Sequence, residues 1–251
     1  MKLFNWKSWL IGTALSALVF VPSQAMAIPT GLELLLLVDV SGSVDSNEYN
    51  LQKTGYINAF NDAGIQALIT GTTGGIAVAY AEWSGSSQQS LLVNWMQLTD
   101  ATTSSAFATA IGATSRAFSG STGPGSAINW GVPLFNNNFE GTRSVIDVSG
   151  DGAQNTGANT FNAATAALAA GITVNGLAIG GGSLPAWYQA NIVTPGGGFL
   201  VTANNFSDFS DAVKTKIGRE ITPSAASPSV LLLMGIGFAA MGLAHRRRNN
   251  G

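Results

Sequence analysis

Leu34-Leu-Leu-Leu-Val-Asp-Val-Ser-Gly-Ser43 is the stretch that decides the fold predicted from this sequence. Its continuous apolar run is typical of a strand buried on both faces of a parallel sheet. The run ends in the carboxylate of Asp39 and the hydroxyls of Ser41 and Ser43. Open α/β sheets bind ligands at the carboxyl ends of their strands, so three oxygen-bearing side chains at this point indicate a site for a small hard cation.

The rest of residues 28–222 continues an alternation of strands and helices without an internal linker or repeat. We expect further strands at 76–83, 90–98, 143–148, 172–179 and 198–201, with a turn between the first two that makes them an antiparallel pair. Asp45 and Glu48 indicate a capping box at the start of the first helix. The pattern predicts an α/β fold, a doubly wound and mostly parallel sheet with one antiparallel edge strand and helices on both faces.

Five further helices are expected between and after these strands. Three of them cover 101–118, 160–170 and 205–221, and residues 184–193 form a short one. The fifth begins near Ser126 and is expected to be short or kinked at Pro133.

Composition excludes several classes of protein. The chain has 251 residues, a net charge of −2 and 10% charged residues, so it has no basic surface for nucleic acid. Cysteine is absent, which excludes disulfides, thiol catalysis and thiolate metal sites.

Both ends of the sequence are typical of targeting segments. Residues 1–27 have a basic start, an apolar run and a small-x-small ending, the layout of a secretory signal peptide, with an uncleaved anchor as the alternative. Residues 223–229 form a small-residue linker, and residues 230–251 an apolar tail that ends in an Arg cluster. This tail resembles the PEP-CTERM sorting signals of Gram-negative bacteria, although it lacks their acidic residue. We therefore expect an exported protein at the periplasm, cell surface or extracellular matrix, attached to the membrane by the tail unless the tail is processed.

The ligand types limit the choice of ion. In an extended strand Asp39, Ser41 and Ser43 face the same way, and an all-oxygen set suits Mg²⁺, Ca²⁺ or Mn²⁺ better than Zn²⁺ or Cu²⁺. One carboxylate and two hydroxyls bind a cation weakly, so other loops must contribute. Ser126 and Asp151 follow other elements at suitable places.

Asp39-Val-Ser-Gly-Ser43 resembles the Asp-x-Ser-x-Ser motif of von Willebrand factor type A domains, where it forms a metal-ion-dependent adhesion site. The family completes that site with a Thr from a second loop and an Asp from a third. The resemblance implies Asp151 as the third-loop ligand and Ser126 as the second-loop ligand, with Thr122 as the alternative. It also implies a divalent cation, with Mg²⁺ as the first expectation.

This resemblance covers nearly the whole mature chain, and several segments are similar to an uncharacterised bacterial subgroup of these domains. Ala81-Glu-Trp-Ser-Gly85 is one of them. The resemblance implies a protein-binding module for adhesion or assembly, in which an Asp or Glu of the partner completes the coordination of the cation.

Two other functions stay open at this point. A metal-dependent hydrolase could use the same ligands, and a structural envelope or matrix protein could carry a vestigial site. Asp39 could also simply cap its loop, with the serines as turn residues. We expect no enzyme, because the sole histidine, His245, lies in the tail and no phosphate-binding P-loop is present.

Overall fold

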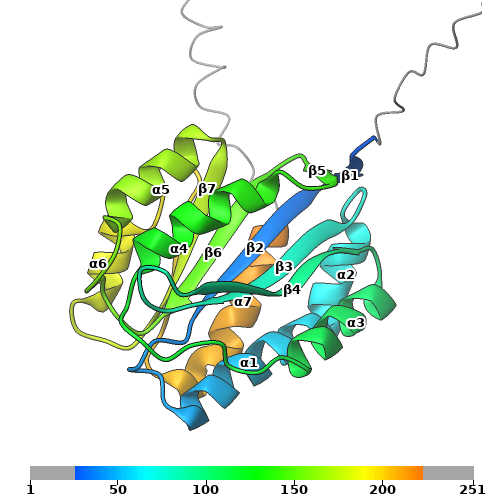
Figure 1. Cartoon of the computed structure of the whole chain (residues 1–251). Coiled ribbons are helices and arrows are strands. Elements are labelled where there is room, and N and C mark those ends of the chain that lie inside the picture. Colours follow the sequence, from blue (N-terminus) through cyan, green and yellow to red (C-terminus); the bar gives the residue numbers. More distant parts are fainter. Residues whose placement is uncertain (1–25, 223–251) are drawn as a thin grey trace, which may run out of the picture.

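The computed structural model describes residues 26–222, which form a sheet between two layers of helices (Figure 1). Six strands pair in the order β4-β3-β2-β6-β7-β8, and only β3 and β4 are antiparallel. The strands are β1 (Ile28–Thr30), β2 (Leu32–Asp39), β3 (Ile76–Trp83), β4 (Gln89–Leu98), β5 (Phe139–Gly141), β6 (Ser144–Gly150), β7 (Ile172–Ile179) and β8 (Leu200–Ala203).

Helices cover both faces of this sheet. They are α1 (Ser46–Asn61), α2 (Ala63–Gly71), α3 (Ala101–Gly112), α4 (Pro124–Gly131), α5 (Thr160–Ala169), α6 (Leu184–Asn191) and α7 (Phe209–Ile221), with short 3-10 helices η1 (Val132–Phe135) and η2 (Phe206–Asp208). One hydrophobic core lies between the sheet and α1, α2, α3 and α7, and the other between the sheet and α4, α5 and α6. The prediction of a doubly wound, mostly parallel sheet with one antiparallel edge strand is confirmed.

Strand β2 runs through the middle of the molecule and is buried along its whole length. Leu34, Leu36 and Val38 belong to one core, while Leu35 and Leu37 belong to the other. This alternation explains the uninterrupted apolar run, because both faces of a central parallel strand are covered by helices.

The start of α1 confirms the expected capping box. The Asp45 carboxylate accepts hydrogen bonds from the backbone N–H groups of Asn47 and Glu48, at 2.7 and 2.9 Å. In return the Glu48 carboxylate accepts the Asp45 N–H at 2.8 Å. These bonds satisfy backbone donors that a helix leaves free at its first turn, and they fix the exit of the chain from the loop after β2.

Some boundaries differ from the sequence prediction. Helix α3 ends at Gly112 instead of 118, which leaves residues 113–123 as a long loop. Helix α4 begins at Pro124, two residues before the expected start at Ser126. It ends at Gly131, and Pro133 lies in the 3-10 helix η1 that follows, which agrees with the prediction of a short helix here. The parallel pair β1 and β5 was not predicted, because strands of three residues carry no readable pattern.

The predicted targeting segments lie almost entirely outside the described part of the chain. Only the last two residues of the expected signal peptide (1–27) are described, and the linker (223–229) and tail (230–251) are not. Within residues 26–222, no helix combines the length and the apolar character needed to cross a membrane.

Truncation of one buried side chain in the central strand β2 tests this packing. Leu36→Ala should lower the free energy of unfolding by about 2–5 kcal/mol, because it removes buried methyl groups and leaves a cavity. Leu51→Ala is the matched control, since Leu51 lies on α1 with 43% of its surface exposed and should change stability by about 0.5 kcal/mol or less. Urea unfolding curves measure both values, and equal losses in the two variants would contradict the described core.

Candidate metal centre

The loop after β2 brings its three oxygen-bearing side chains together, as the sequence indicated. Asp39 is completely buried, and its Oδ1 accepts a hydrogen bond from the Ser41 N–H at 2.8 Å. The hydroxyl oxygens of Ser41 and Ser43 lie 3.2 Å apart. The Asp-x-Ser-x-Ser segment therefore forms one compact group of oxygens.

The loop after β6 supplies the second carboxylate. Strand β6 pairs in parallel with β2, with Val38 beside Ser149, so the two loops leave the sheet at the same edge. Asp151 lies in the β6 loop, and its Oδ1 accepts a hydrogen bond from the Ser43 hydroxyl at 2.7 Å. The structure thus brings Asp39, Ser43 and Asp151 into one site.

The second loop contributes Thr122, the alternative, instead of Ser126. The Thr122 hydroxyl donates to Ser41 Oγ at 3.3 Å, and the residue is only 6% exposed. Ser126 lies inside α4, and its Oγ accepts the Ala158 N–H at 3.0 Å. Ser126 thus fastens the loop before α5, and the hydroxyl that reaches the oxygen group belongs to Thr122.

This difference has a local physical reason. Pro124 is the first residue of α4, a position where proline is favoured because its missing N–H would be unpaired anyway. The proline therefore starts the helix instead of ending the loop. Ser126 falls within the helix, and Thr122 becomes the hydroxyl residue just before it.

The end of β3 holds the second loop in position. The buried Glu82 carboxylate accepts hydrogen bonds from the Tyr49 hydroxyl at 2.9 Å and from the Ala117 N–H at 2.8 Å. The Ser84 hydroxyl accepts the Gly120 N–H at 2.7 Å and donates to the Ser121 carbonyl at 2.9 Å. The segment Ala81-Glu-Trp-Ser-Gly85 therefore anchors the loop that carries Thr122.

Arg116 ties the second loop to the first. Its guanidinium donates to the carbonyl oxygens of Val40, Ser41 and Val44, at 2.9, 2.9 and 2.7 Å. The same side chain donates to the Phe118 carbonyl at 2.8 Å. Four backbone carbonyls on two loops thus accept hydrogen bonds from the single guanidinium group of Arg116, which fixes the backbone on either side of the serines.

Asn155 ties the third loop to the second. Its side-chain oxygen accepts the Thr122 N–H at 2.9 Å, and its own N–H donates to the Thr122 carbonyl at 3.0 Å. The structure shows that these bonds reach the neighbouring loop and hold the Thr122 backbone from both sides.

The buried carboxylate of Asp39 is incompletely satisfied. Among the described residues its Oδ2 has no hydrogen-bond partner, and burial raises the pKa of Asp39 to about 7. Burial also raises the pKa of Asp151. Only glycine fits at position 150, because a Cβ there would lie 2.6 Å from Asp39 Oδ2 and 2.7 Å from the Tyr188 hydroxyl.

The oxygen group fits a hard divalent cation. Within residues 26–222 no three His, Cys, Asp or Glu side chains gather as a metal site, so the two carboxylates depend on hydroxyl oxygens to complete a ligand set. A cation beside Asp39 would neutralise the buried charge and occupy its free oxygen. Oxygen-only donors suit Mg²⁺, Ca²⁺ or Mn²⁺.

Sequence reasoning did not find Arg116 or the role of Glu82 and Ser84. Arg116 lies within the range that was expected to be helical, so its position gave no signal. Glu82 is a carboxylate inside an apolar strand, which in retrospect is a readable sign of a buried hydrogen-bond acceptor.

Comparison with known proteins places the chain in a family. The model of the family described as "Protein of unknown function (DUF1194)" matches residues 29–225. The chain belongs to this family. A search of curated proteins found no sequence match.

Several solved structures are similar in fold. Proximal thread matrix protein 1 from the mussel byssus has a TM-score of 0.57 at 17% identity, over 77% of this chain and 48% of its own. The open form of the pilus adhesin SpaC from Lactobacillus rhamnosus GG has a TM-score of 0.58 at 16% identity, over 76% and 30%. A von Willebrand factor type A protein from Catenulispora acidiphila has a TM-score of 0.56 at 14% identity, over 76% and 43%.

These similarities establish the fold, which is that of von Willebrand factor type A domains. The chain spans less than half the length of each of these proteins. A further structure of the mussel protein, with a zinc-occupied MIDAS motif, has a TM-score of 0.56 at 16% identity, over 75% of this chain and 45% of its own.

Removal of Arg116 tests how the loops are held. Arg116→Met should cost about 1.5–3 kcal/mol of stability or more, because several part-buried carbonyls lose a charged donor. Amide hydrogen exchange should accelerate at residues 40–44 before it changes elsewhere.

Lys214→Met is the control, because the Lys214 ion pairs are partly exposed at 3.7 and 4.0 Å and contribute about 1 kcal/mol at most. If the rate of amide hydrogen exchange at residues 40–44 is unchanged in Arg116→Met, the first loop does not depend on the Arg116 side chain.

Proposed function

We propose that this domain binds a divalent cation and, through it, a carboxylate of a partner protein. The ligands in this proposal are Asp39, Ser41, Ser43, Thr122 and Asp151, with Thr122 in place of the expected Ser126. The observation that carries the proposal is the completely buried Oδ2 of Asp39, which has no hydrogen-bond partner among the described residues although its loop carries the hydroxyls of Ser41 and Ser43. A buried charge without a partner is costly, and a bound cation removes that cost.

An open coordination position favours an external carboxylate as the final ligand. The five proposed ligands supply five oxygens, whereas a hard cation such as Mg²⁺ takes six, so one position remains for an oxygen of the partner. Ser43 and Asp151 lie at the accessible side of the site, while Asp39 and Ser41 are buried beneath them. An Asp or Glu side chain of a partner would therefore approach over Ser43 and Asp151.

The similar folds support this class of function. They include a pilus adhesin and a byssal matrix protein, and one structure of the matrix protein has a zinc-occupied MIDAS motif. Mg²⁺ is the ion that we propose first, with Ca²⁺ or Mn²⁺ as alternatives, because all five ligands are oxygens. We propose that the site binds a partner and catalyses no reaction. Its hydroxyl and carboxylate groups form hydrogen bonds with one another and would serve as ligands of the ion.

The location of the protein is part of the same proposal. Residues 1–27 would direct export, residues 28–222 would form the binding domain, and residues 230–251, after the linker 223–229, would retain it at the envelope until processing. An exported domain with a metal-completed docking site fits adhesion or assembly at the cell surface.

Thermal unfolding with and without cation tests the metal site. Mg²⁺ at about 100 times its Kd should stabilise the wild-type domain by about 2.7 kcal/mol, and a chelator should reverse the shift. Asp39→Asn removes the buried charge, so we expect the metal-free form to keep its stability while the response to Mg²⁺ is lost.

Thr122→Ala and Ser126→Ala form a matched pair for the second loop. Thr122→Ala should weaken the response to Mg²⁺, and Ser126→Ala should keep it, because the Ser126 hydroxyl only accepts the Ala158 N–H. The proposal fails if Mg²⁺, Ca²⁺ and Mn²⁺ all leave the unfolding temperature of the wild type unchanged.

Capture of partners from envelope extract tests the second half of the proposal. Immobilised wild-type domain should retain a partner with Mg²⁺ and release it with chelator, and Ser126→Ala should behave in the same way. Asp39→Asn and Thr122→Ala should retain at least about tenfold less, the equivalent of about 1.4 kcal/mol. Retention that is equal in all four proteins and indifferent to chelator would contradict a metal-completed interface.

A further inference from the structure

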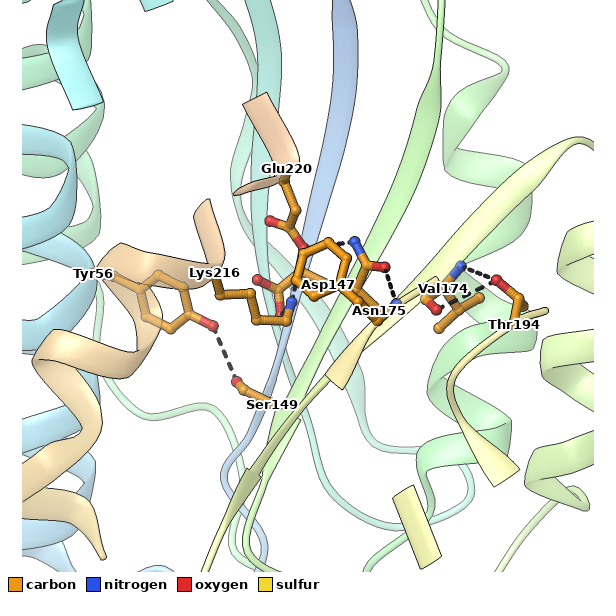
Figure 2. Close-up of polar contacts among 9 residues, drawn as sticks. Tyr56, Asp147, Ser149, Val174, Asn175, Thr194, Lys216 and Glu220 are labelled. Atoms are coloured by element: carbon orange, nitrogen blue, oxygen red, sulfur yellow. Dashed lines mark hydrogen bonds and ion pairs between the residues drawn. The ribbon is translucent and has the colours of Figure 1, made fainter. Parts of the chain in front are cut away.

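A second polar cluster lies inside the core, between the sheet and α7. Figure 2 shows Lys216 of α7 reaching Asp147 of β6, with Glu220 and Asn175 beside them. Lys216 and Asp147 are 0% exposed, and Glu220 is 1% exposed. Nothing in the proposed function uses these residues.

The contacts of the Lys216 amine are unequal. Its Nζ lies 2.8 Å from Glu220 Oε1 in a hydrogen bond, and the same oxygen accepts the Asn175 Nδ2–H at 3.0 Å. The Nζ also lies 2.5 Å from Asp147 Oδ1. That second contact is off the hydrogen-bond direction, since Asp147 has no hydrogen-bond partner at either oxygen among the described residues.

This geometry is poor for a permanent ion pair. A buried pair repays the cost of leaving water only when its remaining oxygens are also hydrogen-bonded. Here both oxygens of Asp147 and the Oε2 of Glu220 lack such partners within the described chain. An amide between Lys216 and Asp147 would eliminate one of these oxygens and both charges, and its N–H would still donate to Glu220.

We propose that the Lys216 amine and the Asp147 carboxyl condense into an intramolecular amide bond that links α7 to β6, with Glu220 carrying the protons. The amine and the carboxyl already touch, and Glu220 touches the amine. Asp147 and Lys216 are 69 positions apart in the sequence, so the bond would close a large loop across the core.

The reaction balances without any other reagent. Lys216 gives a proton to Glu220, and the nitrogen lone pair then attacks Cγ of protonated Asp147 to form the new C–N bond. The C–O bond to one Asp147 oxygen breaks, and that oxygen leaves as water. One ammonium proton joins the proton of the Asp147 carboxyl on this water, one stays on the amide nitrogen, and the third remains on Glu220, which ends protonated.

The surroundings favour this condensation. Holding the two reacting groups in contact replaces an encounter in solution with a step inside one molecule. Burial raises the pKa of both Asp147 and Glu220, which favours the protonated carboxyl that the attack requires. A cavity of about 270 Å³ lined by Asn175 and Glu220, among others, adjoins the cluster and gives the released water a way out.

Mass spectrometry of the denatured full-length chain tests the bond. The wild type should be lighter than its sequence by one water. Trypsin cleaves after Arg143, Lys214 and Arg219 but not at an acylated Lys216, so we expect peptide 215–219 joined to peptide 144–214. Fragmentation should place the branch on Asp147 and Lys216.

Several results would overturn the assignment. A free peptide 217–219 in the whole sample would show that Lys216 is unmodified. The same free peptide together with a loss of water from 144–214 would point to a succinimide at Asp151-Gly152 instead. Loss of ammonia would make Asn175 the acyl donor, and a branch on Glu220 would likewise contradict the proposal.

Two variants separate chemistry from folding. Glu220→Gln keeps the shape of the side chain without its proton-carrying role, and the cross-linked fraction should fall at least tenfold in a protein whose circular dichroism is unchanged. The double variant Asp147→Leu with Lys216→Met replaces both charges by apolar groups and should show no loss of water. Complete cross-linking in Glu220→Gln would exclude Glu220 as the proton carrier.

Discussion

The carboxylate of Asp39 lies at the end of a completely buried strand, and the arrangement of the three loops follows from that constraint. A charge in this place needs compensation that water cannot supply. One of its oxygens is satisfied by the backbone of its own loop, and the other has no hydrogen-bond partner among the described residues. Because β6 pairs beside β2, the second carboxylate arrives at the same edge of the sheet. The candidate metal centre is therefore a consequence of which strands are neighbours.

The sequence carried enough information for the fold and for two of the three loops. Continuous apolar strands, the Asp45 cap and the regular alternation of elements are local signals, and all of them appear in the structure. Asp39, Ser41, Ser43 and Asp151 follow directly from strand ends. Thr122 did not, because the two hydroxyl residues Thr122 and Ser126 lie on either side of Pro124, and the start of α4 at Pro124 decides which of them faces the site.

What the sequence could not predict is the network that holds the loops. Arg116 binds carbonyls more than seventy positions away, and Glu82 and Ser84 bind the backbone of residues 117–121. Backbone carbonyls and N–H groups are present at every position, so no residue pattern marks the ones that such side chains select. The same holds for Lys216 and Asp147, whose contact exists only after α7 has packed on the sheet.

The two ends of the described chain lie at one pole of the domain. Strand β1 precedes the amino end of β2, and the carbonyl of Ile221, at the end of α7, accepts a hydrogen bond from Arg143 just before β6 (Figure 1). The oxygen group lies at the opposite ends of the same strands, about 25 Å away for a strand of eight residues. The described chain therefore begins and ends at the pole farthest from the oxygen group. A surface fixed at either of these ends would leave the opposite pole open, as the proposed docking of a partner requires.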